Sequence, residues 1–214
     1  MTNTHLVGDM SIHSTHPLAE SLEGRKVVLG SQSPRRVELL KALNIPFEVR
    51  PSNASEEHSA FVHPEDFPLV LAKRKAECLK VDLAPDEILI TADTIVILDR
   101  DVLEKPKNLD EAHSFLQRLS SEWHTVVTGY CITTTKRQFQ SSAKSRIRFN
   151  ALAEEEIAYY LDHYQVLDKA GAYGIQDWIG LIGIAEIVGS YHNVMGLPTA
   201  QLYQDLKVFL KNKD

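Results

Sequence analysis

A long apolar run, interrupted once by an aspartate, constrains the fold of this chain more than any other feature. Residues 88–92 (ILITA) form a nearly continuous apolar segment, and a second segment (IVIL) follows at residues 95–98. Such runs are typical of strands that are buried on both faces of a sheet. Asp93 and Thr94 stand between the two segments, and burying an unpaired carboxylate is expensive. We therefore expect Asp93 to be paired, hydrogen-bonded, bound to a metal, or placed at a strand end that faces a cleft.

Residues 30–36 (GSQSPRR) read as a tight turn between a strand and a helix. An apolar run precedes this segment, and apolar residues at helical spacing follow it. Ser33 suits the N-cap and Pro34 suits the first helical position, where its missing N–H costs nothing. Backbone N–H groups, hydroxyls and two guanidinium groups would converge there, and such a cluster attracts a polyphosphate. The alternative is a capped helix with two solvated arginines.

The rest of the chain mixes predicted helices and strands. Helical patterns cover residues 34–43, 66–80, 108–119, 153–162 and the segment that follows Pro198, and strand patterns cover residues 27–29, 47–50, 124–135, 139–149 and 178–188. The two long runs at 124–135 and 139–149 predict an antiparallel pair. Residues 168–176 (DKAGAYGIQ) have the profile of a loop whose backbone shape matters. A mixed-sheet α/β protein with a cleft between two lobes fits this order best.

Charge and cysteine content argue against several classes of protein. A net charge of −6 over 214 residues argues against general nucleic-acid binding. Cys78 and Cys131 form neither a metal-type pair nor a disulfide framework, which indicates a cytoplasmic protein. No apolar run approaches membrane-spanning length, and the polar residues 1–24 lack the apolar centre of a signal peptide. We expect residues 1–24 to form a flexible arm and residues 25–214 to form a single domain.

Several short, separated motifs carry a resemblance to a known family. They are SQSPRR at 31–36, the acidic loop that ends in Glu56, Lys75 in its helix, ADT at 92–94, EKP at 104–106, HTV at 124–126, DKAGAYGIQ at 168–176 and GSYHNVMGLP at 189–198. Together and in this order they are highly specific. Over roughly residues 26–210 the chain resembles the Maf-type nucleoside triphosphate pyrophosphatases. The resemblance implies a fold like that of inosine triphosphatases, with a two-lobed mixed sheet and helices around a central cleft, and it suggests a homodimer.

The resemblance also implies an activity and a set of site residues. The reaction is hydrolysis of a nucleoside triphosphate between its α and β phosphates, with a divalent metal (Mg²⁺ or Mn²⁺) and with Asp93 as general base. The positions that carry over are Ser31, Arg35, Arg36, Glu56, Lys75, Asp93, Lys105 and Gln176. Arginines can grip phosphate oxygens in bidentate fashion, and lysines act as compact point charges. Glu56 and Asp93 are the expected metal ligands, because Mg²⁺ prefers carboxylates and water.

Three positions favour dTTP, UTP or modified pyrimidine nucleotides as substrates. The 7-methyl-GTP group of the family reads SPWR, SDQ and KSE where this chain has SPRR (33–36), ADT (92–94) and GIQ (174–176). Arg35, Thr94 and Gln176 are therefore the expected specificity residues. A tryptophan would stack on a cationic methylated purine, whereas the amide of Gln176 suits a neutral pyrimidine edge. The alternatives are a 7-methyl-GTP pyrophosphatase and a nucleotide-binding regulator of cell division, and the presence of Asp93 favours an enzyme.

Overall fold

One continuous sheet runs through the part of the chain that the structure describes. The computed structural model describes residues 5–7, 12–55 and 63–212. Its strands lie in the order β1-β3-β2-β4-β6-β7-β8, and β5 pairs with β4 outside this path. They are β1 (His5–Val7), β2 (Lys26–Leu29), β3 (Phe47–Val49), β4 (Glu87–Leu98), β5 (Asp101–Leu103), β6 (Trp123–Thr133), β7 (Gln138–Phe149) and β8 (Ile184–Val188).

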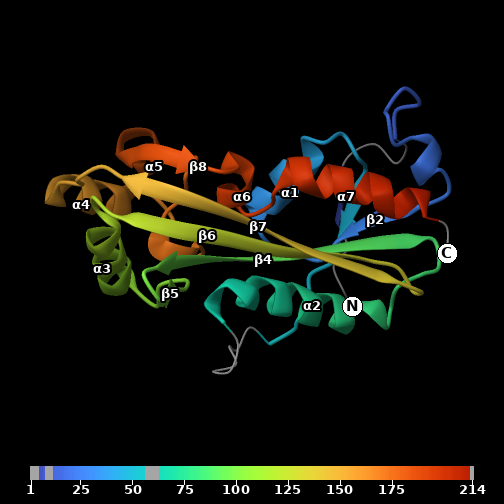
Figure 1. Ribbon diagram of the computed structural model, residues 1–214, viewed down its shortest axis with the longest axis horizontal. Helices are drawn as coiled ribbons and strands as arrows, with labels where there is room; N and C mark the ends of the chain where they lie inside the picture. Colours follow the sequence, from blue (N-terminus) through green and yellow to red (C-terminus); the bar gives the residue numbers. More distant parts are fainter. Residues whose placement is uncertain (1–4, 8–11, 56–62, 213–214) are drawn as a thin grey trace.

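Helices cover both faces of this sheet. The α-helices of the described residues are α1 (Pro34–Lys41), α2 (Phe67–Lys80), α3 (Leu109–Leu119), α4 (Glu154–His163), α5 (Trp178–Gly183), α6 (Tyr191–Met195) and α7 (Thr199–Lys211). Helices α1 and α7 lie on one side of the sheet and α2 lies on the other (Figure 1). Within the described ranges, no helix is both long enough and apolar enough to cross a membrane.

The pairing of the strands confirms the expected mixed sheet. Strand β2 runs parallel to β3 and β4, whereas the β4–β6, β6–β7 and β7–β8 pairs are antiparallel. The antiparallel pair expected from residues 124–135 and 139–149 is β6 and β7. Together with β4, these strands are the long elements that span the molecule (Figure 1).

Strand β4 passes through two lobes of the core. In its first half, Ile88 and Ile90 pack with α1 and α7, while Leu89 packs with α2 on the opposite face. In its second half, Val96 and Leu98 pack with α3, α4 and α5. Successive residues of a strand point to opposite faces, which explains this alternation. Burial on both faces is the arrangement that the apolar run predicts.

The structure corrects the strand expected over residues 178–188. Residues 178–183 form α5, and only residues 184–188 form the edge strand β8. Ile179 is fully buried while Leu181 is 79% exposed, although residues two apart would share one face of a strand. Gly180 lets the helix approach the preceding loop, because a Cβ atom there would lie 2.0 Å from the Ile175 carbonyl oxygen. A short apolar run does not by itself separate helix from strand.

The described residues before position 25 differ from the expected flexible arm. Strand β1 pairs antiparallel with β3. Leu18 and Leu22 are 1% and 5% exposed and lie in the same core cluster as α7. Because these two leucines are four residues apart around a helical turn, both side chains enter the core together. Residues 1–4 and 8–11 lie outside the described ranges.

Candidate active site

The site is built on an open stretch of the edge of β4. Strand β2 pairs with β4 only as far as Ile90, whose carbonyl accepts the N–H of Gly30 at 2.7 Å. Strand β5 begins to pair with β4 at Val96. Between these two positions, no described strand lies on this side of β4. A cavity of about 520 Å³ occupies the gap, beyond the carboxyl end of β2, where open α/β sheets commonly bind ligands.

The cavity gathers the site residues predicted from the sequence. Its lining includes Ser31, Arg35, Arg36, Lys75, Asp93, Thr94, Lys105 and Gln176. Glu56 lies outside the described residues, so its expected role as a metal ligand stays a prediction. Because the edge of β4 is open here, side chains from both faces of the strand reach the same cavity.

Asp93 is paired and also lines the cavity. The Lys75 ammonium donates to Asp93 Oδ1 at 2.5 Å, and the two side chains are only 10% and 13% exposed. Lys75 comes from the buried face of α2, whereas its neighbour Lys73 is about half exposed. This ion pair offsets the cost of burying the carboxylate. Asp93 is therefore both paired and exposed to a cavity, which are two of the placements expected from the sequence.

Arg36 joins three separate motifs. Its Nε donates to the Gly196 carbonyl at 2.9 Å, its Nη1 donates to Ser31 Oγ at 3.2 Å, and its Nη2 donates to Thr94 Oγ1 at 3.0 Å. Thr94 Oγ1 also lies 2.9 Å from Thr128 Oγ1. The guanidinium is therefore held at a fixed angle beside the cavity. Thr94 contributes to the site by holding this arginine as well as by lining the cavity.

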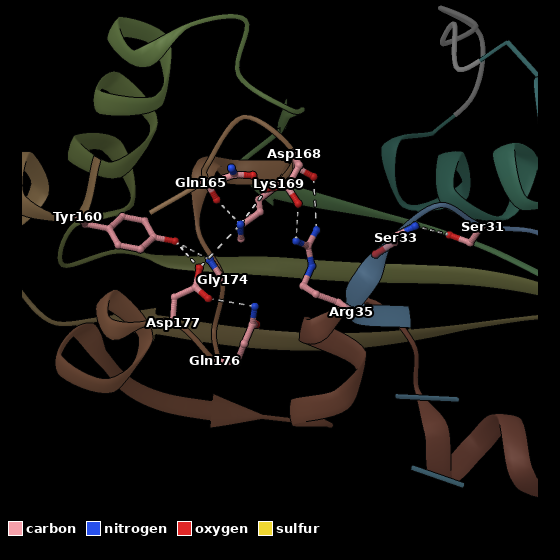
Figure 2. Close-up of polar contacts among 10 residues, drawn as sticks. All are labelled: Ser31, Ser33, Arg35, Tyr160, Gln165, Asp168, Lys169, Gly174, Gln176 and Asp177. Atoms are coloured by element: carbon pink, nitrogen blue, oxygen red, sulfur yellow. Dashed lines mark hydrogen bonds and ion pairs between the residues drawn. The ribbon is translucent and has the colours of Figure 1, made fainter. Parts of the chain in front are cut away.

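Arg35 turns away from Arg36 and reaches the loop that follows α4. Its Nη1 donates to Asp168 Oδ2 at 2.8 Å, and its Nη2 donates to the Asp168 carbonyl at 3.3 Å (Figure 2). Burial alone would raise the pKa of Asp168, but hydrogen bonds from Lys169 and Arg35 outweigh burial and lower it. The two neighbouring arginines thus face different parts of the site.

Gln176 lies at the other end of the same loop. Its Nε2 donates to Asp177 Oδ1 at 3.2 Å (Figure 2). Its Oε1 is buried and has no hydrogen-bond partner among the described residues. A buried carbonyl oxygen without a donor is unfavourable, so a bound ligand that supplies a donor would be favoured there.

Four further ionisable side chains line the cavity that were not among the predicted site residues. They are Glu104, Asp168, Lys169 and Tyr173. Each lies in or beside one of the quoted motifs, which is the only sequence signal that could have identified them. Lys169 is 8% exposed and donates to Asp168 Oδ1 at 2.8 Å. Lys169 is therefore a second basic side chain, beside Arg35, at the part of the cavity wall that contains Asp168.

His124 lies behind this wall as a neutral buried residue. Its Nε2 is 2.7 Å from the hydroxyl of Tyr173, and its ring stacks on Phe149 with centroids 5.6 Å apart. Its Nδ1 has no partner within the described residues. Burial lowers the pKa of His124 to about 3.

The burial of His124 in its neutral form predicts that the protein becomes less stable at acidic pH. An unfolded histidine takes up a proton near pH 6.5, whereas His124 in the folded chain stays neutral until about pH 3. The unfolded state therefore binds more protons in this window, and the free energy of unfolding falls as the pH drops below 6.5. The slope from this group approaches about 1.4 kcal/mol per pH unit.

The measurement is urea unfolding at pH 7 and pH 5. His124→Gln should lose most of this pH dependence, because glutamine does not titrate and can still bond the Tyr173 hydroxyl. His192→Gln, at an exposed histidine, is the matched control and should keep the pH dependence. Equal pH dependence in His124→Gln and the unsubstituted chain would contradict the assignment.

The arrangement suits a polyanionic ligand. Five basic residues line the cavity, namely Arg35, Arg36, Lys75, Lys105 and Lys169, against three acidic ones, Asp93, Glu104 and Asp168. No cysteine or histidine occurs among its described lining residues. Cys131 is buried elsewhere, and desolvation raises its pKa to about 11. The site can therefore neutralise the charge of an anion beside the carboxylate of Asp93, and it offers no cysteine thiolate for nucleophilic attack among the described lining residues.

Comparisons with known proteins place the chain in a family. The family model described as Maf-like protein matches residues 26–209. A dTTP/UTP pyrophosphatase of Parabacteroides distasonis is 49% identical over 193 residues, which cover 90% of this chain and 100% of that protein. Proteins with the same name from Phocaeicola vulgatus and Porphyromonas gingivalis are 48% and 46% identical, over 89% and 90% of this chain and 99% and 98% of their own lengths.

Proposed function

Because this chain belongs to the Maf family, we propose that it is a nucleoside triphosphate pyrophosphatase that hydrolyses dTTP and UTP. The products are the nucleoside monophosphate and pyrophosphate. The single observation that carries this proposal is the basic cavity at the open edge of β4, which surrounds the carboxylate of Asp93. The name shared by relatives that match the chain over almost its whole length supports the choice of substrate.

We propose that the triphosphate binds to Ser31 and to the basic side chains of Arg36, Lys75 and Lys105. Ser31 and Arg36 stand at the start of α1, while Lys75 and Lys105 come from α2 and from the segment after β5. Charge on the phosphoryl oxygens is stabilised best by donors that are already in place before the reaction. The three acceptors that hold Arg36 support this role, because they orient its guanidinium in the absence of substrate.

Asp93 is the proposed general base. Water adds to the α phosphorus as the bond from that phosphorus to the oxygen bridging the α and β phosphates breaks. A proton of the water passes to Asp93, and pyrophosphate leaves. A carboxylate can accept this proton when it lies within hydrogen-bond reach of the attacking water. The ion pair with Lys75 supports the assignment, because it holds a carboxylate at the wall of a cavity that is otherwise rich in cations.

A divalent metal, Mg²⁺ or Mn²⁺, is the proposed cofactor. The described residues contain no group of three or more His, Cys, Asp or Glu side chains that could hold a metal by themselves. Mg²⁺ in nucleotide enzymes is commonly bound by one or two carboxylates together with phosphate oxygens and water, and Asp93 fits such a site. When bound, the metal would neutralise charge on the phosphates. Glu56 is the proposed second ligand.

The test is a pyrophosphate-release assay with Mg²⁺ or Mn²⁺ across a panel of nucleotides. We expect turnover of dTTP and UTP to exceed that of purine triphosphates and 7-methyl-GTP. Loss of activity in the presence of a chelator would support the metal. No turnover of any triphosphate would overturn the proposal and favour a nucleotide-binding regulator.

A triple substitution should move the preference toward 7-methyl-GTP. Combining Arg35→Trp, Thr94→Gln and Gln176→Glu supplies a stacking surface and a charge for the methylated purine. We expect the ratio of kcat/KM for 7-methyl-GTP over UTP to rise by about tenfold or more, which is about 1.4 kcal/mol. Activity on every substrate should fall, because Thr94→Gln removes the oxygen that accepts from Arg36 Nη2.

Glutamate at position 176 would also face the carboxylate of Asp177. Adding Asp177→Asn to the triple variant should therefore raise its activity on 7-methyl-GTP, since like charges at this distance repel. Arg35→Trp alone serves as the comparison. If dTTP and UTP remained the best substrates of both multiple variants, the specificity assignment would be wrong.

We also propose that the chain forms a homodimer in the cytoplasm. Exposed apolar side chains on adjacent elements support self-association, since Leu181 of α5 is 79% exposed and Val188 of β8 is 53% exposed. Light scattering during size-exclusion chromatography tests the dimer, and a monomer at micromolar concentration would contradict it.

A further inference from the structure

The amide of Gln176 is held in one of its two possible orientations. Its Nε2 donates to Asp177 Oδ1 at 3.2 Å, and its buried Oε1 has no partner among the described residues. The oxygen and nitrogen of an amide differ in chemistry, because one accepts and the other donates. A carboxylate without a proton only accepts, so the NH₂ group must face Asp177 and the oxygen must face away from it.

Asp177 is itself fixed by groups from outside its own helix. The Tyr160 hydroxyl donates to Asp177 Oδ2 at 2.7 Å, and the Lys169 ammonium lies 3.9 Å from the same oxygen (Figure 2). Asp177 occupies the N-cap position of α5, yet its side chain makes no capping hydrogen bond. Aspartate is favoured at this position because it usually caps the helix. Here the carboxylate is directed to Tyr160 and Gln176 instead.

Gly174 leaves the space that this pair of side chains occupies. Its N–H donates to the Tyr160 hydroxyl at 3.1 Å. A Cβ atom at this position would lie 2.4 Å from Asp177 Oδ2 and 2.8 Å from Gln176 Nε2. Both atoms are the ends of side chains, so a methyl group would displace them before it disturbed the backbone. Gly174, Tyr160 and Asp177 therefore form one support for the amide.

We propose that Asp177 is a positioning residue for base selection, which orients Gln176 so that its Oε1 accepts the N3–H of uracil or thymine. This inference rests on the proposed function and adds how the base is chosen. Uracil and thymine carry a hydrogen at N3, whereas cytosine carries a lone pair there. A fixed acceptor forms a hydrogen bond with the N3–H of uracil or thymine. Against cytosine it forms no hydrogen bond, because its lone pair and the N3 lone pair repel each other. Sites built around one hydrogen bond reject analogues that lack it.

The experiment compares kcat/KM for UTP and CTP in Asp177→Asn. Asparagine both donates and accepts, so the Gln176 amide becomes free to rotate and present its NH₂ group to N3 of cytosine. We expect the UTP-to-CTP ratio to fall about tenfold or more, mostly through KM, with kcat for UTP changed less. Asp177→Glu keeps an acceptor-only group and should retain more of the selectivity. Asp162→Asn, at an exposed carboxylate on α4, is the matched control.

Two further variants keep the inference testable if Asp177→Asn folds poorly. Gly174→Ala should lower the same ratio, because its methyl group displaces the carboxylate and the amide. In a Gln176→Ala background, Asp177→Asn should leave the ratio unchanged, since the amide on which it acts is gone. Thermal melting checks that each variant is folded.

The outcomes separate this inference from the proposed function. If the unsubstituted protein hydrolyses no pyrimidine triphosphate, the proposed function fails. If it hydrolyses UTP and the folded Asp177→Asn variant keeps the full UTP-to-CTP ratio, only the positioning role fails. An equal change of the ratio with and without Gln176 would also overturn that role, because Asp177 would then act by another route.

Discussion

Asp93→Asn should abolish hydrolysis while nucleotide binding survives. Asparagine matches aspartate in size and can still accept from the Lys75 ammonium, so the contact between β4 and α2 is kept. It cannot take up the proton of the attacking water. General-base catalysis contributes about 10² to 10⁴ in rate, so we expect kcat to fall about 10³-fold.

Turnover and binding have to be measured on the same preparation. Pyrophosphate release gives kcat, and calorimetry with a triphosphate whose α–β bridge cannot be hydrolysed gives the Kd. We expect the Kd to change by less than about tenfold. Asp86→Asn, an exposed carboxylate just before β4, is the control and should behave like the unsubstituted protein. Unchanged turnover in Asp93→Asn would remove this residue from the mechanism.

Arg36→Lys should lower both the stability and the activity of the protein, although it keeps the positive charge. A lysine keeps the positive charge but cannot reach the Gly196 carbonyl, Ser31 and Thr94 together as the planar guanidinium does. Hydrogen bonds to charged groups contribute about 1.5 to 3 kcal/mol each, and two would be lost. We expect the free energy of unfolding to fall by about 3 kcal/mol and kcat/KM to fall about 10² to 10³-fold.

The neighbouring arginine offers a matched comparison. Arg35 is 20% exposed and pairs with one residue, Asp168, so Arg35→Lys should change the free energy of unfolding by less than about 1 kcal/mol. Urea unfolding and UTP kinetics on both variants test the difference. Equal losses of stability in Arg36→Lys and Arg35→Lys would show that the three-way contact of Arg36 does not hold the site together.

This difference between two adjacent arginines was only partly predictable. The sequence places both at the start of a helix, and the resemblance separates a phosphate ligand from a specificity residue. Apart from Ser31, their partners come from positions 94, 168 and 196, which are far away along the chain. No local sequence pattern shows which of these distant residues each arginine contacts.

The sequence by itself determined most of the architecture. The apolar runs of β4, the long antiparallel pair β6–β7, and Ser33-Pro34 before α1 are local signals, and the structure contains all of these elements. Local signals succeed here because strand and helix periodicities depend on neighbouring residues. They fail at α5, where the apolar run is too short, and at Leu18 and Leu22, whose burial depends on distant helix α7.

Only the tertiary structure decided how the site residues meet. Asp93 and Thr94 point to opposite faces of β4, yet both reach one cavity because β2 ends before them and β5 begins after them. Helical phase selects Lys75 rather than Lys73 as the partner of Asp93. The orientation of Gln176 depends on Asp177 and on Tyr160 from another helix. Residue types are local properties of a chain, whereas a site is a set of distances that exists only after the chain has packed.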